Sequence, residues 1–270
     1  MIPNVLTIAG SDSGGGAGIQ ADLKTFAALG TYGLSVIAAL TAQNTRHVTG
    51  IHDVPPDFVR AQLDAVFEDI TIKAVKIGMV SRPEVIDAVA AGLERHDARI
   101  VVLDPVMVAK SGDRLLREEA VQTLKERLLP LATLITPNLP EAGVLLGREP
   151  ARDEHGMVEM AAALRALGPF AVLLKGGHLE GGEAIDVLDD GAEPLVLSAR
   201  RIETEATHGT GDTLSSAIAA LLARGLSLRE AVRGAKTYLT RAIEAAGELQ
   251  VGQGHGPVHH FHALWPQETR

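Results

Sequence analysis

Two glycine-rich segments of this sequence have the residue types needed to bind an anion. The first is Gly10-Ser11-Asp12-Ser13-Gly14-Gly15-Gly16-Ala17-Gly18, which joins an apolar run to a helical pattern. Backbone N–H groups exposed at a helix N-terminus form a natural anion site. The segment is not G-x-G-x-x-G, because Ile19 stands where the last glycine belongs, and the chain has no Gly-Lys pair for a Walker A loop. Anion binding and a plain tight turn both remain open.

The second segment, Gly209-Thr210-Gly211-Asp212, places a carboxylate at the start of an apolar helical pattern. The glycines allow several backbone N–H groups to face one point, where the helix dipole adds positive charge. A phosphoryl group losing its leaving oxygen needs such a field, and Asp212 could accept the proton of an attacking hydroxyl. An N-cap role for Asp212 is the simpler alternative. The glycines in front of it favour catalysis.

Further carboxylates and lysines follow other predicted strands. Asn138 and Glu141 are three residues apart, which suits a water-bridged Mg²⁺ shell and equally a capping box at a helix start. Asp104 ends an apolar run and Lys110 follows it, so a metal or phosphate role competes with a buried turn. Lys175 precedes two glycines and could reach a triphosphate, or it could be a solvated strand end.

The elements that must position these residues alternate along the chain. Strands are predicted at residues 5–9, 35–42, 74–79, 100–103, 133–136, 171–175, 185–188 and 194–197. Helices are predicted at 17–29, 57–70, 83–96, 118–129, 141–146, 154–167, 213–224 and 228–246. This alternation predicts an α/β fold, with a mostly parallel sheet covered on both faces, in a single domain over residues 1–270. Ligands of such sheets bind beyond the carboxyl ends of the strands, where the segments above fall.

Composition excludes several classes of protein. The net charge is −9 and no basic run appears, which argues against a nucleic-acid partner. The chain has no Cys, so a disulfide framework, a thiolate metal site and a thiol nucleophile are excluded. The uncharged stretch 25–45 is broken by Gly30 and Gly33, so we expect a helix end, a turn and a strand rather than a membrane span. The histidines near the C-terminus lack a regular ligand spacing, which favours packing or surface roles. We expect a cytoplasmic protein.

Taken together, the segments resemble the hydroxymethylpyrimidine/phosphomethylpyrimidine kinases of the ribokinase superfamily. The resemblance covers nearly the whole chain, and its motifs lie at residues 6–25, 42–45, 76–79, 104–107, 109–112, 135–142, 175–178 and 254–260. It implies a three-layer α/β/α fold and two successive ATP-dependent phosphorylations in one site. These act on the 5-hydroxymethyl group of 4-amino-5-hydroxymethyl-2-methylpyrimidine and then on the resulting phosphate, in thiamine biosynthesis. It also implies a homodimer.

The resemblance also assigns roles to individual residues. Gln43 would pair with the pyrimidine, and an amide does offer a donor and an acceptor side by side. The pocket around the pyrimidine would be lined by Gly10, Asp22, Met79 and Val106. Mg²⁺ and the phosphates of ATP would be organised by Asn138, Glu141 and Asp104, with Lys175 and Lys110 contacting ATP. Gly209, Thr210 and Gly211 would form the anion hole beside Asp212.

One position departs from the family pattern. These kinases commonly read Gly-Thr-Gly-Cys, whereas this chain has Asp212 in the last position. Aspartate is the usual base of the wider superfamily, which includes pyridoxal kinases, so a pyridoxal or pyridoxine kinase is the alternative function. A non-catalytic pyrimidine-binding protein is a further alternative, and the intact Asp212 and glycines argue against it.

Overall fold

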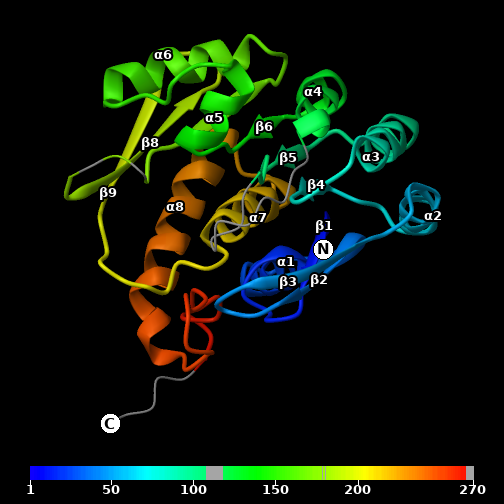
Figure 1. The fold of residues 1–270 in the computed structure, drawn as a ribbon, viewed down its shortest axis with the longest axis horizontal. Helices are drawn as coiled ribbons and strands as arrows, with labels where there is room; N and C mark the ends of the chain where they lie inside the picture. The colour runs from blue at the N-terminus through cyan, green and yellow to red at the C-terminus, as the bar shows by residue number, and fades with distance from the viewer. Residues whose placement is uncertain (108–117, 178, 180, 266–270) are drawn as a thin grey trace.

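A single nine-stranded sheet runs through the part of the chain that the computed structural model describes, which is residues 1–107, 118–177, 179 and 181–265 (Figure 1). The strand order is β3-β2-β1-β4-β5-β6-β7-β8-β9. The six strands from β2 to β7 in this order pair in parallel, and β3, β8 and β9 add antiparallel pairs at the two edges. The strands are β1 Asn4–Asp12, β2 Tyr32–Gln43, β3 Val48–Asp53, β4 Ala74–Ile77, β5 Val101–Leu103, β6 Leu134–Ile135, β7 Ala171–Lys175, β8 Glu183–Asp189 and β9 Leu195–Arg200.

Helices cover both faces of the sheet, because the central strands are apolar on both sides. In β5, Val101 and Leu103 pack with α2, α3, α4, α5 and α6, whereas Val102 points to the opposite face, against α1, α7 and α8. The helices are α1 Gly18–Ala28, α2 Pro56–Phe67, α3 Pro83–Arg95, α4 Glu118–Arg127, α5 Leu139–Leu146, α6 Glu154–Arg165, α7 Thr210–Ala223 and α8 Leu228–Glu244, with short 3-10 turns at Leu129–Leu131 and Ala245–Glu248. The three-layer α/β/α fold with a mostly parallel sheet is confirmed.

Local sequence explains where several elements begin and end. α5 begins with a complete capping box and ends at Gly147, whose φ of +66° is easy only for glycine. α8 begins with a second capping box, formed by Ser227 and Glu230. The uncharged stretch 25–45 is divided as expected, since α1 ends at Ala28 and β2 begins at Tyr32. No helix in the described part of the chain has the length and the apolar character needed to span a bilayer.

The sequence-based prediction misses one strand, β3. Val48–Asp53 is exposed along most of its length and contains Gly50, so it shows neither a buried run nor an alternation. Its formation depends on antiparallel pairing with the end of β2, which no local pattern reveals. The helix predicted at 57–70 also ends earlier, at Phe67.

Candidate active site

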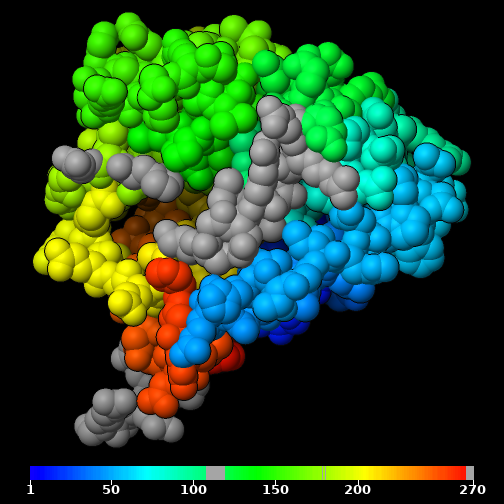
Figure 2. All heavy atoms as spheres, in the orientation of Figure 1, coloured from blue at the N-terminus to red at the C-terminus, as the bar shows by residue number. Residues whose placement is uncertain are grey.

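A cleft of about 740 Å³ opens at the carboxyl ends of the parallel strands. Figure 2 shows this face of the molecule hollowed, with the orange-brown atoms of α8 visible between the green atoms above and the yellow atoms that follow β9. Most of the residues predicted for the site line this cleft: Gly10, Gln43, Met79, Asp104, Val106, Asn138, Glu141, Lys175, Gly209, Thr210, Gly211 and Asp212. Lys110 lies outside the described residues. The fold thus gathers segments from six strand ends and one helix start.

The first turn of α7 faces the cleft without a capping side chain. Its N-cap is Gly209, with φ +76°, so the cap position carries no side chain that could bond to the backbone N–H groups of the turn. A Cβ on Gly209 would collide with the carbonyl oxygen of Gly16, so the two glycine-rich loops are in direct contact. A Cβ on Gly211 would lie 3.1 Å from Asp104 Oδ2. This turn can therefore bind an anion close to a carboxylate and a lysine.

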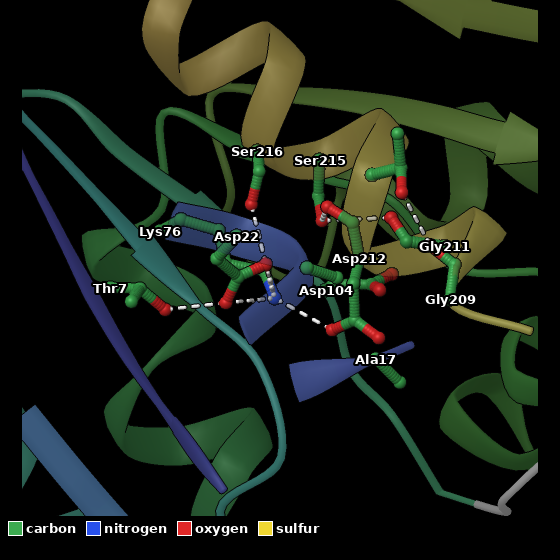
Figure 3. Close-up of polar contacts among 12 residues, drawn as sticks. Thr7, Ala17, Asp22, Lys76, Asp104, Gly209, Gly211, Asp212, Ser215 and Ser216 are labelled. Atoms are coloured by element: carbon green, nitrogen blue, oxygen red, sulfur yellow. Dashed lines mark hydrogen bonds and ion pairs between the residues drawn. The ribbon is translucent and has the colours of Figure 1, made fainter. Parts of the chain in front are cut away.

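Asp212 is the third residue of α7, and its side chain is 15% exposed. Its Oδ1 accepts a hydrogen bond of 2.8 Å from Lys76 Nζ (Figure 3), and the backbone N–H of Gly18 also stabilises its charged form. Burial raises the pKa of Asp212, but the charge and hydrogen bond of Lys76 outweigh burial and lower the pKa overall. Asp212 is thus an ionised carboxylate at the edge of the cleft, the form required of a proton acceptor.

Asp22, which the resemblance assigns to the pyrimidine pocket, is fully buried beneath the cleft and is not among the residues that line it. Its side chain is fully buried, and it accepts hydrogen bonds from Thr7 Oγ1 at 2.6 Å, Ser216 Oγ at 2.6 Å and Lys76 Nζ at 2.8 Å (Figure 3). The reason is its place in the second turn of α1, on the helix face that packs against the sheet and α7. Asp22 thus bonds to β1, β4 and α7, and its contact with a pyrimidine stays a prediction.

A second lysine pairs with carboxylates on the other side of the α7 turn. Lys175 Nζ lies 2.8 Å from Asp104 Oδ1, which also accepts from Thr136 Oγ1 at 2.8 Å. Burial lowers the pKa of Lys175, but Asp104 and Glu141 raise it overall, so the ammonium stays charged. Burial raises the pKa of Glu141 to about 7, and the nearby Asp104 adds to this while Lys175 opposes it. This side of the cleft therefore holds a permanent cation next to a carboxyl that titrates near neutrality.

Asn138 and Glu141 form the capping box that the spacing allowed. Asn138 Oδ1 accepts from the backbone N–H of Glu141, and Glu141 Oε2 accepts from the backbone N–H of Asn138, both at 2.8 Å. Both residues also line the cleft. Glu141 therefore caps α5, and the capping bonds hold its carboxyl at the wall of the cleft. The lone pairs that are not used in capping can accept from or coordinate a ligand.

Gln43, at the end of β2, faces the cleft beside His208. Gln43 Oε1 lies 3.0 Å from Thr41 Oγ1, whose single proton can go either to this oxygen or to the carbonyl of Ser11 at 2.9 Å. His208 Nε2 lies 2.9 Å from Asp12 Oδ2 and donates to it, because an ionised carboxylate only accepts. Burial raises the pKa of Asp12, but hydrogen bonds from His208 and from backbone N–H groups lower it overall. The Gln43 amide nitrogen lies 3.4 Å from His208 Nε2. Because this ring nitrogen donates to Asp12, it does not accept from Gln43, and the amide N–H groups can face a ligand.

Three residues of this region had no role in the sequence-based prediction: Lys76, Asp12 and His208. Lys76 could have been found from the sequence, because it interrupts the apolar strand Ala74–Ile77. A charge inside a buried strand requires an opposite charge nearby, which predicts a carboxylate beside it. Asp12 lies inside the first glycine-rich segment, and His208 directly precedes the second, almost 200 residues later in the chain. Their contact depends on the tertiary structure and no spacing reveals it.

A comparison with protein families gives one decisive match. The model of the phosphomethylpyrimidine kinase family matches residues 12–259. The chain belongs to this family. The match includes the strand ends that form the cleft from Asp12 to Lys175, and also the α7 turn.

Similar proteins carry related names. A hydroxymethylpyrimidine/phosphomethylpyrimidine kinase of Rhizobium meliloti (strain 1021) is 62% identical over 260 residues, which cover 96% of this chain and 97% of that protein. The crystal structure of phosphomethylpyrimidine kinase from Clostridium difficile 630 has a TM-score of 0.80 at 48% identity, covering 89% of this chain and 99% of the other. An ADP complex of Bacillus subtilis pyridoxal kinase has a TM-score of 0.89 at 39% identity, covering 96% and 98%.

Proposed function

We propose that this protein is an ATP-dependent kinase that phosphorylates 4-amino-5-hydroxymethyl-2-methylpyrimidine and then its monophosphate, giving the diphosphate used in thiamine biosynthesis. Membership of the phosphomethylpyrimidine kinase family supports the substrate class. One observation carries the chemistry: the Asp212 carboxylate, the uncapped start of α7 and the Lys175 ammonium all face one cleft. A phosphoryl transfer needs a proton acceptor, an anion site and a cation in such proximity.

Each group has a defined task in the proposed reaction. The acceptor oxygen forms a bond to the γ-phosphorus of ATP, the bond from that phosphorus to the β-γ bridging oxygen breaks, and ADP leaves. Asp212 takes the hydroxyl proton in the first reaction. The backbone N–H groups of Gly209, Thr210 and Gly211 stabilise charge on the transferred group, and Lys175 holds the phosphates. Gln43 pairs with the ring nitrogen and the amino group of the pyrimidine.

The donor set of the cleft fits Mg²⁺ bound mainly through water and phosphate oxygens. Within the described residues, no group of three or more histidines and carboxylates could hold an ion by itself. Asp104 and Glu141 line the cleft and retain lone pairs, and Mg²⁺ in kinases is typically held by one or two carboxylates plus substrate phosphates. We therefore assign Asp104 and Glu141 to the magnesium shell, with Asn138 and Lys110 beside the ATP phosphates. The ion would neutralise charge that develops on the phosphates.

We further propose that the chain forms one domain, acts as a homodimer in the cytoplasm, and has small molecules rather than nucleic acids or membranes as its partners. The resemblance of its motifs to the kinase family supports the dimer. Sedimentation equilibrium of the purified protein would test it, and a monomeric mass at all concentrations would contradict it.

The deciding experiment measures ATP turnover against hydroxymethylpyrimidine, its monophosphate and pyridoxal in parallel. The two pyrimidines should be used in succession, with the diphosphate as final product. Turnover of pyridoxal alone would favour the alternative that the Bacillus subtilis pyridoxal kinase represents.

A Gln43→Leu variant adds a test of pyrimidine recognition. The KM for the pyrimidine should rise about 10- to 100-fold, because lost hydrogen bonds in a closed site cost about 1–3 kcal/mol. The KM for ATP should change little. Thr41→Val, which removes only the hydroxyl beside the amide oxygen, should have a smaller effect. An unchanged pyrimidine KM in Gln43→Leu would remove Gln43 from the site.

A further inference from the structure

Lys76 is a fully buried lysine in the middle of β4, directly beneath the proposed base. Its ammonium lies 2.8 Å from Asp22 Oδ1, 3.0 Å from Asp22 Oδ2 and 2.8 Å from Asp212 Oδ1 (Figure 3). The exposed fraction of its side chain is 0%. Lys76 therefore joins a fully buried carboxylate to one that faces the cleft.

The surroundings are built to hold the ammonium in this place. An unpaired buried charge costs several kcal/mol, so Lys76 needs an anionic partner to be buried at all, and here two carboxylates supply it. Thr7 and Ser216 each donate to one oxygen of Asp22, which fixes the orientation of that carboxylate. A Cβ on Gly78 would lie 2.8 Å from Lys76 Nζ and 3.0 Å from Ala9 Cβ, so glycine at the end of β4 leaves the room that Lys76 needs.

We propose that Lys76 is a positioning residue that fixes Asp212 and keeps it a carboxylate, and that Asp22 is the buried anchor of Lys76. This rests on the proposed function for the role of Asp212, and it assigns Asp22 to support of the base instead of substrate contact. Lys76 also offsets the negative charge of Asp212, which an acceptor carrying a phosphate must approach. The single ammonium thus serves both successive acceptors.

Other charged groups also face Asp212 and must be included in any pH argument. They lie on each element packed against the start of α7 or beside the cleft: Asp12 on β1, Asp22 on α1, Lys76 on β4, Asp104 after β5, Lys175 on β7, Lys236 on α8, and His208 and His260. Of these, Lys76 exerts the largest stabilising effect on the charged form of Asp212, both by charge and by hydrogen bond.

The absence of cysteine from the chain allows a direct test that does not depend on catalysis. In an Asp212→Cys variant, the pH dependence of iodoacetamide alkylation gives the pKa of a single thiol at the position of the base. A thiol near a helix N-terminus and a lysine ionises below its usual pKa of about 8.5. The helix is present in every variant, so differences between variants report the charges beneath it.

Two variants of the Asp212→Cys protein should move this thiol pKa in opposite directions. In Asp212→Cys with Lys76→Met and Asp22→Asn, the cation is lost without leaving a buried unpaired carboxylate, and the midpoint should rise by about 1–3 units. In Asp212→Cys with Asp22→Asn alone, Lys76 remains and a negative neighbour is removed, so the midpoint should fall below that of Asp212→Cys. Asn is nearly isosteric with Asp22, so the second variant should fold and provides the measurement if the first does not fold.

Kinase assays supply the second readout. In the enzyme with Asp212 intact, Lys76→Met with Asp22→Asn should move the acid limb of kcat/KM for the hydroxyl acceptor upward by about 1–3 pH units. Midpoints that stay within 0.3 units in both cysteine variants would overturn the inference, because a purely structural lysine would not set the ionisation of its neighbour. If the thiol midpoints move as expected while no variant shows kinase activity, the inference about Lys76 holds and the proposed function fails.

Discussion

At the scale of single residues, the two acceptors of the proposed kinase make different demands on Asp212. A hydroxyl must lose its proton as it attacks, whereas a phosphate monoester, with a second pKa of about 6, is already largely ionised at neutral pH. The Asp212 carboxylate, which faces the cleft with 15% of its side chain exposed, is therefore needed as a base only in the first reaction.

This difference gives a prediction for Asp212→Ala. Turnover of hydroxymethylpyrimidine should fall by about 10²–10⁴, the usual share of general-base catalysis, whereas turnover of the monophosphate should fall by less than about tenfold. Single-turnover rates with each acceptor would measure the split, with Asp212→Asn as a control for side-chain volume. Equal losses with both acceptors would show that Asp212 acts by binding or structure instead of proton transfer.

Glu141 provides a pH-dependent prediction. Its folded-state pKa of about 7 lies above its usual value of 4.5, so its contribution to stability is fully present below pH 4.5 and is lost as the pH rises through 7. Glu141→Gln keeps the shape of the protonated group and has no such loss. The difference in free energy of unfolding between variant and parent should therefore shift in favour of the variant by on the order of 3 kcal/mol between pH 4.5 and pH 8.

Urea unfolding without nucleotide or Mg²⁺ would measure this. Far-UV circular dichroism is the better probe, because Trp265, the single tryptophan, is 54% exposed near the C-terminus. The same variant should weaken use of Mg·ATP if Glu141 belongs to the magnesium shell. A parent and variant whose stabilities run parallel from pH 4.5 to 8 would contradict the raised pKa.

The residues of the cleft could be predicted to the extent that they follow strand ends. Asp104 directly follows an apolar run, Lys175 ends one and Asn138 lies three residues beyond one, and the parallel sheet brings such positions together. Asp22 could not be placed this way, because it lies within a helix and its partners come from β1, β4 and α7. Tertiary packing decides whether a carboxylate lines the cleft or lies buried beneath it, and residue spacing alone does not reveal this.

At the scale of elements, the start of α7 depends on contact between two loops. Gly209 has a left-handed backbone and no room for a Cβ against Gly16, whereas Gly225, just after the same helix, has a φ of +92° and no atom within 4 Å of a Cβ position. The two glycines therefore share a backbone requirement and differ in their surroundings.

Alanine at each position separates these effects. Gly225→Ala should cost about 1–2 kcal/mol of stability, because it forces a non-glycine residue into the left-handed region, and Gly209→Ala should cost more, because its Cβ also collides with Gly16. Only Gly209→Ala should also lower kcat, by about 10²-fold, since the anion-binding turn must move away from Gly16. Melting temperatures and kcat for both variants would test this, and similar activity losses would contradict it.

At this scale the sequence predicted the order of helices and strands well, because the central strands are continuous apolar runs. The edge strand β3 was missed, since its residues are exposed and its pairing with β2 is the main reason it is extended. Edge elements are held by one neighbour and carry a weaker hydrophobic pattern than central strands.

At the scale of the whole molecule, the C-terminal segment connects the two sides of the cleft. The backbone N–H groups of Gly254 and His255 bond to Thr45, just beyond Gln43, and the carbonyl of Gly256 accepts from the backbone N–H of His208. Residues near positions 45, 208 and 255 thus form one continuous hydrogen-bonded region. The motif at 254–260 was visible in the sequence. Its contacts with Thr45 could not be predicted, because they join residues more than 200 positions apart.

Gly254→Ala tests this connection. A Cβ at Gly254 would collide with the backbone of Thr45, so the tail should shift and disturb Gln43 and His208 together. The pyrimidine KM should rise about tenfold, which corresponds to about 1.4 kcal/mol, with little change in melting temperature. Gly247→Ala, where no atom lies within 4 Å of the Cβ, is the matched control. An unchanged KM in Gly254→Ala would show that the tail is independent of the cleft.

The carboxylate at position 212 also has a consequence for oxidative damage. A thiol held beside Lys76 and a helix N-terminus would be largely thiolate, which is the form that peroxide converts to sulfenic and then to irreversible sulfinic acid. A carboxylate has no such reaction, and this chain contains no cysteine elsewhere that could form a mixed disulfide. The proton acceptor of this cleft therefore stays chemically intact in an oxidising cell, where a thiol in the same place would need a reductant to recover.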